Sequence, residues 1–331
     1  MFSGINAHFR KSPVTPSAPD RGSPIDLPEG SQPSTTPVAS LPAQQTSLPL
    51  DDTPEMDQSS GRMPTADEIL ASYHLPMPKP LWLNAAHAKH IVKGNFMTLS
   101  ARPKTVEMGE WIAHQVVEHW RILITFIRLV HDKEGDGFSI CNPRKCPKMS
   151  AGPNHSFTWL NSRLEPCEIP ACEYLSLVQR YISGKIDDQR IFPTDATGIS
   201  FADNPAFCSP LLTDGAEEDW VGKRSGFPKN FLDVCQTIFR QMFRVYAHLY
   251  WTHFEDPMFH MNLEKSMNSC FSHFILTATT LDLLRPADLE PMQPLIDLWA
   301  ALGTFPRESK AYSYANLPVG ERLLQLAGVA P

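Results

Sequence analysis

The chain has 331 residues and is 42% hydrophobic and 20% charged, so it is long enough to bury a sizeable core in one large domain or two small ones. No uninterrupted apolar run approaches the roughly 20 residues of a transmembrane helix, and the first residues lack the basic and apolar regions of a secretory signal. The formal net charge of -7 argues against a protein that binds nucleic acid by neutralising phosphates, but it permits a basic partner.

Residues 1–63 have the composition of a disordered tail. Proline, serine, threonine, glutamine and aspartate dominate there, and the only aromatic residues are Phe2 and Phe9. Such a segment cannot bury enough apolar surface to offset the entropy lost on ordering. The folded body is expected to begin near Thr65, because Thr65 and Glu68 fit a capping box at the start of a short helix.

Apolar residues at helical spacing predict four longer helices in the body. They run over about 106–131, from Pro170 to Gly184, from Pro228 to about Phe254, and over 260–282. Near 137–160 an alternation of polar and apolar residues favours a small β-hairpin. Residues 195–225 have few periodic apolar positions, which is typical of a long surface loop. The sequence therefore predicts a mainly α fold, a helical bundle with minor β content.

Two pairs of residues have the spacing of metal ligands. Cys141 and Cys146 flank a loop that contains proline, and His248 and His253 lie at the end of the third long helix. Both gaps match those of structural zinc sites. Soft thiolates and imidazoles suit Zn²⁺, and four protein ligands leave no free position for water, so the metal would be structural. Two histidines five residues apart are about 140° apart around a regular helix, so they converge only if the helix end loosens.

Other arrangements of these residues remain open on spacing alone. Cys167 and Cys172 repeat the same gap, so a site of four cysteines, built with Cys141 and Cys146, is an alternative. All these cysteines and histidines could equally be buried core residues. The odd total of seven cysteines and the missing export signal favour thiols in a reducing compartment over disulfides. We therefore expect a cytoplasmic protein that can reach membranes or the nuclear envelope through its partners.

The first long helix carries a polar face opposite its apolar stripe. This face consists of five residues, with Trp111 at its edge: Glu107, Glu110, His114, Glu118 and Arg121. A largely acidic face beside an aromatic residue can dock a basic amphipathic helix. The alternative is a solvated face on which the N-terminal lead-in covers the tryptophan.

Enzyme motifs are missing from the sequence. It contains no G-x-S-x-G, no glycine-rich phosphate loop and no kinase loop set. The segment from His248 to His253 contains no glutamate, so it lacks the general base of the H-E-x-x-H metalloproteases. A zinc hydrolase would also need a free coordination position. We therefore expect a protein that is not an enzyme.

Several motifs, in one consistent order over about 80–300, resemble the Mob/phocein family. They are GEWIA at 109–113, CNPRKCPKMSAGP at 141–153, IFP at 191–193, GFPKNF at 226–231, FRVYAHLYWTHF at 243–254 and SCFSHF at 269–274. The resemblance implies a Mob-type helical bundle in which Cys141, Cys146, His248 and His253 hold a structural zinc. It places the family domain at 64–302, with an insertion at 195–225 and a C-terminal extension at 303–331.

The resemblance also implies a non-catalytic adaptor, and members of the family fall into two classes. Some are subunits of striatin-interacting complexes that contain protein phosphatase 2A and kinases. Others bind the basic N-terminal segment of nuclear Dbf2-related or large tumour suppressor (NDR/LATS-type) kinases on an acidic surface, which corresponds to the polar face described above. The insertion and the leucine-rich C-terminal segment look most like the fungal phocein-type branch, so we expect the first class, with the second as the alternative.

One departure concerns phosphopeptide binding. Members that bind phosphopeptides carry three basic residues before the paired histidines, and the corresponding positions here are Arg240, Gln241 and Arg244. The missing middle charge removes one charge-assisted contact to phosphate. Arg240 and Arg244 are the remaining candidates for such a contact.

Overall fold

The structure is a computed structural model that describes residues 63–90, 97–132, 139–194 and 220–327. The predicted disordered tail lies outside the described residues except for Met63, and so does the predicted insertion up to residue 219. Residues 328–331 of the predicted C-terminal extension also lie outside them. The domain limits drawn from the resemblance therefore stay a prediction.

The described body begins with the predicted short helix, α1 (Ala66–Ser72). The Thr65 side chain accepts the Glu68 N–H, and the Glu68 carboxylate accepts the Thr65 N–H at 2.6 Å, so the predicted capping box is confirmed. A proline-rich lead-in follows and reaches the short helix η1 (Leu81–Leu83). Trp82 and Leu83 of η1 are buried, which anchors the lead-in to the core.

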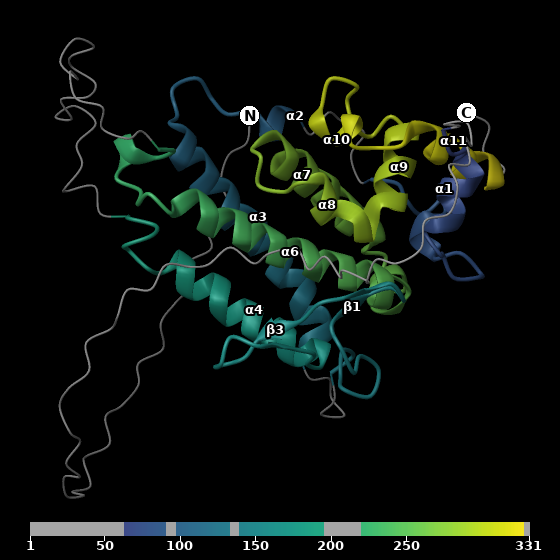
Figure 1. The fold of residues 1–331 in the computed structure, drawn as a ribbon, viewed down its shortest axis with the longest axis horizontal. Coiled ribbons are helices and arrows are strands. Elements are labelled where there is room, and N and C mark those ends of the chain that lie inside the picture. The colour runs from purple at the N-terminus through teal and green to yellow at the C-terminus, as the bar shows by residue number, and fades with distance from the viewer. Residues whose placement is uncertain (1–62, 91–96, 133–138, 195–219, 328–331) are drawn as a thin grey trace, which may run out of the picture. The chain divides into compact units, whose positions relative to one another are not determined.

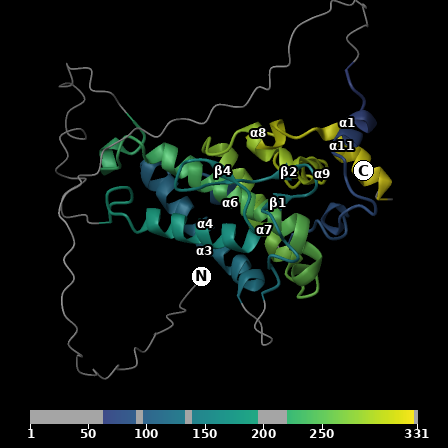
Figure 2. The same cartoon turned by 60° about the horizontal axis from the view of Figure 1, so that its bottom comes forward.

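The four predicted long helices are all present. They are α3 (Met108–His131), α4 (Ala171–Ile186), α6 (Phe231–His253) and α7 (Glu264–Thr280). The helix α3 packs along α6, and Figure 1 shows α4 on one side of α6 and α7 on the other. Turned by 60°, the same helices still lie against one another (Figure 2). A short helix, α2 (Met97–Ser100), rests on α7 through a 2.9 Å hydrogen bond between the Ser100 and Thr277 hydroxyls.

The helix ends differ from the predictions in two places. Gly184 does not end α4, because the helix continues through it to Ile186 with Gly184 exposed. The fourth long helix, α7, begins at Glu264 because the chain between α6 and α7 forms an irregular turn, η4 (Phe254–Phe259). Within η4, Asp256 has non-helical dihedral angles and Pro257 lacks an N–H to donate, so the regular helix cannot continue.

In the parts of the chain that the structure describes, two small antiparallel strand pairs are present where the sequence predicts one hairpin. Strand β1 (Ser150–Ala151) pairs with β2 (His155–Ser156), and β3 (Trp159–Leu160) pairs with β4 (Pro166–Cys167). In the first pair Ala151 lies opposite His155, and in the second Trp159 lies opposite Cys167. The strand β1 packs on α6, so this region covers the helix that carries the paired histidines.

The C-terminal part of the body consists of short helices, and prolines begin several of them. They are α8 (Pro286–Leu289), η5 (Glu290–Met292), α9 (Gln293–Ala301), α10 (Lys310–Ser313) and α11 (Leu317–Leu326). A proline in the first turn has no hydrogen bond to lose there. The helix α11 packs on α9 and on α1, and Figure 1 shows α1 and α11 side by side.

A buried carboxylate fastens these terminal segments together. Asp297 of α9 is fully buried and accepts hydrogen bonds from the Tyr73 hydroxyl at 2.7 Å and from the Asn316 N–H at 2.7 Å. Near the surface, Arg322 of α11 pairs with Asp67 of α1 at 2.7 Å. The N-terminal and C-terminal segments of the body therefore stabilise each other. Within the described residues no helix is long and apolar enough to cross a membrane.

Candidate functional site

The cysteine loop is fixed by its own backbone and by Asn142. The Cys141 N–H donates to the carbonyl of Val130, near the end of α3, at 2.7 Å. The Asn142 side-chain oxygen accepts the N–H groups of Arg144 and Lys145, and its carbonyl accepts the Cys146 N–H at 2.8 Å. These hydrogen bonds fix the backbone of the loop that carries both thiols.

The histidines come from the end of α6. His248 lies inside the helix, while His253 is its last residue and has a φ of -125°, outside the helical range. This loosened end turns the second imidazole toward the first, and the ring centroids are 5.2 Å apart. The local distortion before η4 therefore overcomes the angular separation that a regular helix would impose.

Cys141, Cys146, His248 and His253 form one buried cluster whose ligand atoms all lie within 4.8 Å of one another. The Cys141 Sγ lies 3.7 Å from His248 Nε2, and the Cys146 Sγ lies 3.5 Å from His253 Nε2. Zinc–sulfur and zinc–nitrogen bonds of ordinary length, set at a tetrahedral angle, give a sulfur-to-nitrogen edge of about 3.6 Å. The donor set and its spacing therefore fit a tetrahedral zinc ion.

The alternative four-cysteine set does not come together in the described residues. The Cys167 thiol donates to the Trp159 carbonyl at 3.1 Å, and Cys172 is half-buried in α4 outside the cluster. Of the two ligand sets that spacing leaves open, this arrangement favours the one with the two histidines.

Hydrogen bonds and charges around the cluster suit metal ligation. The His248 Nδ1 lies 2.8 Å from the Ser150 carbonyl of β1, so it carries the proton and its Nε2 lone pair faces Cys141. A hydrogen bond from the Cys141 thiol, with the two imidazoles nearby, lowers the pKa of Cys146, while the same hydrogen bond and burial raise the pKa of Cys141. The pair therefore holds one thiolate, and the Cys141 thiol would release its proton when a metal binds. Burial lowers the pKa of His253 and keeps that ring neutral. Thiolate and neutral imidazole are the forms that bind a metal.

The acidic residues at the start of α3 are used inside the protein. Glu107 is the N-cap of α3 and accepts the N–H groups of Gly109 and Glu110. Its carboxylate also accepts the Gly222 N–H at 3.2 Å, and Glu110 accepts the Ser225 hydroxyl at 3.0 Å. Both glutamates are half-buried, since residues 222–225, which include η3 (Lys223–Ser225), lie against the helix start. No local signal in the sequence indicates this contact.

The next turns of the polar face are more open. Trp111 is half-buried; its Nε1 donates to the Ser100 carbonyl at 3.3 Å, and its ring stacks on the exposed His114 ring at a centroid distance of 5.3 Å. Glu118 pairs with Arg121 at 3.3 Å, and 44% of its side chain is exposed. The end of α2, rather than the N-terminal lead-in of the solvated-face alternative, therefore covers part of Trp111. The surface left in solvent combines an aromatic pair with the Glu118 carboxylate and the exposed Arg121 that pairs with it.

Arg240 and Arg244 lie together at a small cavity of about 160 Å³. Arg244 donates to the Tyr174 hydroxyl at 3.1 Å and stacks over Phe157, while Arg240 donates to Thr237. Gln241, at the position of the missing charge, instead accepts the Tyr174 hydroxyl. Neither arginine has a carboxylate within ion-pair distance in the described part of the chain. Asp288 and Glu290 nevertheless line the same cavity and reduce its positive charge.

Comparison with known proteins supports the resemblance seen in the motifs. The profile of the Mob1/phocein family matches residues 88–213 and 211–292, which together span more than half of the chain. The chain belongs to the Mob1/phocein family.

Several proteins that are similar to this chain are fungal members of the family. The CBK1 kinase activator protein MOB2 of Candida albicans is 32% identical over 232 residues, which are 70% of this chain and 63% of the relative. Maintenance of ploidy protein mob2 of Schizosaccharomyces pombe is 33% identical over 220 residues, 66% of this chain and 76% of the relative. The Saccharomyces cerevisiae CBK1 kinase activator protein MOB2 is 32% identical over 213 residues. This match spans 62% of that relative, so less than two thirds of two of these relatives is covered. Two of the three names describe kinase activation, and none mentions striatin or a phosphatase.

Proposed function

We propose that this chain is a non-catalytic, zinc-stabilised adaptor that binds and activates a protein kinase of the NDR/LATS type. The observation that carries the proposal is the solvent-facing strip of α3, where Trp111, His114 and Glu118 offer an aromatic platform beside a negative charge. The names of the MOB2 relatives favour a kinase as the partner over the striatin-interacting complex that the motif resemblance alone favours.

The kinase segment that fits this strip is a basic amphipathic helix. Its cations would lie toward Glu118 and toward the half-buried charges of Glu107 and Glu110, while an apolar side chain would pack on the Trp111–His114 pair. Glu107 and Glu110 contribute their field more than direct contacts, because residues 222–225 partly cover them. Docking should therefore be sensitive to salt.

A charge reversal tests the kinase reading. Glu118→Lys should weaken binding of the purified kinase's N-terminal segment at least fivefold at low salt, whereas Glu173→Lys, an equal change on the exposed side of α4, should leave binding unchanged. Glu118 is chosen over Glu107 because it caps no helix. Equal affinities of the two variants would refute the proposed surface. Co-purification of the full chain with striatin and phosphatase subunits, without a kinase of this type, would favour the other class.

The role of the metal in this adaptor is to hold the fold. Zinc at the Cys₂His₂ cluster would tie the loop after α3 to the end of α6, two segments more than 100 residues apart in the sequence. Elemental analysis of the purified chain should find one zinc per molecule. Cys146→Ser should lose the zinc and melt at a much lower temperature, while Cys235→Ser, which changes a buried cysteine outside the cluster, should retain the zinc. Zinc-free protein that melts like the zinc-loaded form would contradict this role.

For the arginine pair, we propose weak binding of phosphopeptides. Two guanidinium groups without carboxylate partners favour an anion, but Asp288 and Glu290 at the rim oppose a doubly charged phosphate. Titration with a phosphothreonine peptide should give weak binding that strengthens when Glu290 is changed to Gln. Affinity unaffected by both Glu290→Gln and Arg244→Ala would exclude the cavity as the site.

A further inference from the structure

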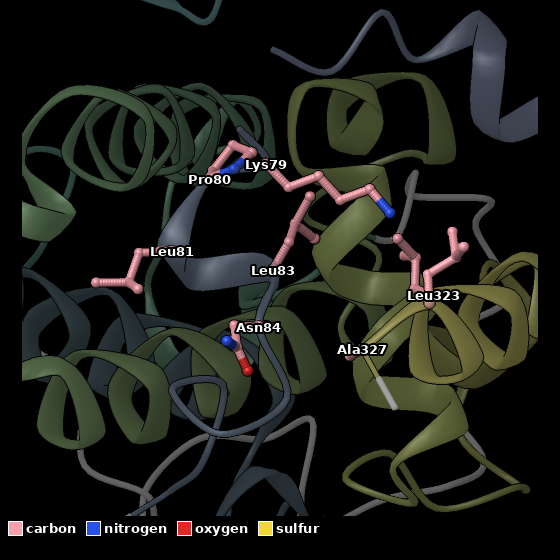
Figure 3. Close-up of a pocket in the computed structure, with 8 residues that line it drawn as sticks. Lys79, Pro80, Leu81, Leu83, Asn84, Leu323 and Ala327 are labelled. Atoms are coloured by element: carbon pink, nitrogen blue, oxygen red, sulfur yellow. The ribbon is translucent and has the colours of Figure 1, made fainter. Parts of the chain in front are cut away.

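A second small cavity lies where the lead-in to the body meets its last helix. It has a volume of about 210 Å³ and is lined by Lys79, Pro80, Leu81, Leu83, Asn84, Leu323, Leu326 and Ala327. Figure 3 shows the Lys79 side chain extending above Leu83 toward Leu323 of α11. No lining residue belongs to the metal cluster or to the exposed face of α3. Both walls also lie outside residues 88–292, which the family profile matches.

The floor of the cavity is apolar and buried, and its outer wall is exposed to solvent. Leu83 and Leu323 are 4% and 2% exposed, while Leu326, one turn further along α11, is 50% exposed. Because Leu326 is half-exposed beside an open apolar cavity, an apolar group of a partner that packs there would be stabilised by the burial of apolar surface. The volume is below the roughly 300–1,000 Å³ of pockets that enclose drug-sized ligands, so it suits single side chains of a peptide better than a whole small molecule or an acyl chain.

The polar groups at the rim are donors that the fold leaves unused. Lys79 has no hydrogen bond or ion pair within the described residues. The oxygen of the Asn84 side chain accepts the Ala86 N–H, while its amide donors have no partner in the described part of the protein. None of the lining residues is acidic. The cation nearby on α11, Arg322, is already paired with Asp67. The rim therefore complements a carboxylate and repels a cation.

We propose that this cavity is a docking site for a peptide segment of a partner protein in which a large aliphatic residue is followed closely by an acidic one. The aliphatic side chain fills the space between Leu83 and Leu326, and the carboxylate pairs with the Lys79 ammonium and accepts from the Asn84 amide. This partner has the opposite charge from the basic segment expected at α3. The adaptor thus has two docking sites that select partners of opposite charge.

A library of random decapeptides displayed on phage, selected on the purified full-length chain, tests the proposal. Enriched peptides should contain an aliphatic residue near an aspartate or glutamate, and a synthetic version of the strongest one should bind the chain in a fluorescence anisotropy assay. Lys79→Glu and Leu326→Glu should each weaken that peptide about tenfold or more. The matched controls are Lys89→Glu and Leu164→Glu, which make the same changes at exposed positions away from the cavity and should bind as the wild type does.

Melting curves and zinc content, measured for all four variants, separate loss of the site from loss of the fold. Perturbation of the Leu323 and Leu326 methyl resonances on adding the peptide would place it in the cavity. Selection of basic peptides, or equal weakening by the control variants, would overturn the proposal. So would a concentration-dependent dimer that Leu326→Glu alone disperses, since the occupant would then be a second copy of the chain. None of these outcomes depends on whether the kinase binds at α3.

Discussion

His119 of α3 is a polar residue in an aromatic part of the core, and replacing it with phenylalanine should stabilise the protein. Its side chain is 1% exposed, and its ring lies 4.7 Å from His273, 5.4 Å from Phe274 and 5.9 Å from Phe239, measured between centroids. Neither ring nitrogen has a hydrogen-bond partner among the residues that the structure describes. A neutral imidazole always carries one N–H and one lone pair, so His119 leaves both unsatisfied in a buried site.

The increase in the free energy of unfolding expected for His119→Phe follows from the unsatisfied N–H and lone pair of the His119 ring. An unpaired buried donor or acceptor costs about 1–3 kcal/mol. Phenylalanine has nearly the same shape and adds edge-to-face contacts with rings already present. At pH 8 the free energy of unfolding should therefore rise by about 1–3 kcal/mol in the variant.

The gain should grow as the pH falls. Burial, with repulsion from His273 and His114, lowers the pKa of His119 well below its usual value, and burial lowers the pKa of His273 to about 4. His119 therefore takes up a proton only when the protein unfolds, which stabilises the unfolded state below pH 6.5. At pH 5.5, protonation of His119 in the unfolded state lowers the free energy of unfolding of the wild type by about 1.4 kcal/mol, for an unfolded-state pKa of 6.5. At pH 8 this decrease is absent. The variant has no such proton to gain.

Urea denaturation of both proteins at pH 8 and pH 5.5 measures this difference. Zinc content should be checked in each sample, because acid also releases metal; as long as both proteins keep their zinc, that effect cancels between them. His260→Gln, a change at an exposed histidine, is the matched control. A variant less stable than the wild type at pH 8, or a difference that does not widen at pH 5.5, would refute the reasoning.

The remaining predictions concern glycines and a helix cap. Gly184→Ala should raise the free energy of unfolding by about 0.5–1 kcal/mol, because the residue lies inside α4 and nothing would touch the new methyl group. Gly320→Ala should lower the melting temperature sharply, since its Cβ would lie 2.1 Å from the Asp297 carbonyl oxygen. Equal effects of these two changes would contradict the packing of α11 on α9. Glu107→Ala should cost about 1 kcal/mol as the α3 cap is lost, and hydrogen exchange at Gly222 should speed up; protection unchanged there would argue against the Glu107 contact.

Local signals in the sequence determined the helices and the ligand pairs. The apolar spacing located α3, α4, α6 and α7, and Thr65 with Glu68 located α1, because these signals act over a few residues. The short range of these signals also explains the wrong prediction for the end of α4. Gly184 reads as a helix end, but a glycine is tolerated inside a helix when the surrounding turns are packed, and the fold extends α4 beyond it.

Only the tertiary structure decided between arrangements that depend on distant contacts. Spacing could not choose between Cys167 with Cys172 and His248 with His253 as partners of the cysteine loop. The motif resemblance implied the histidines, and only the loosened end of α6 and the packing of β1 on that helix show how they reach the loop. The acidic start of α3 looked free in sequence, yet residues more than 100 positions away cover it. The cavity beside Leu326 exists because the lead-in and α11 meet in space. Such contacts depend on how elements pack, which no short window of residues contains.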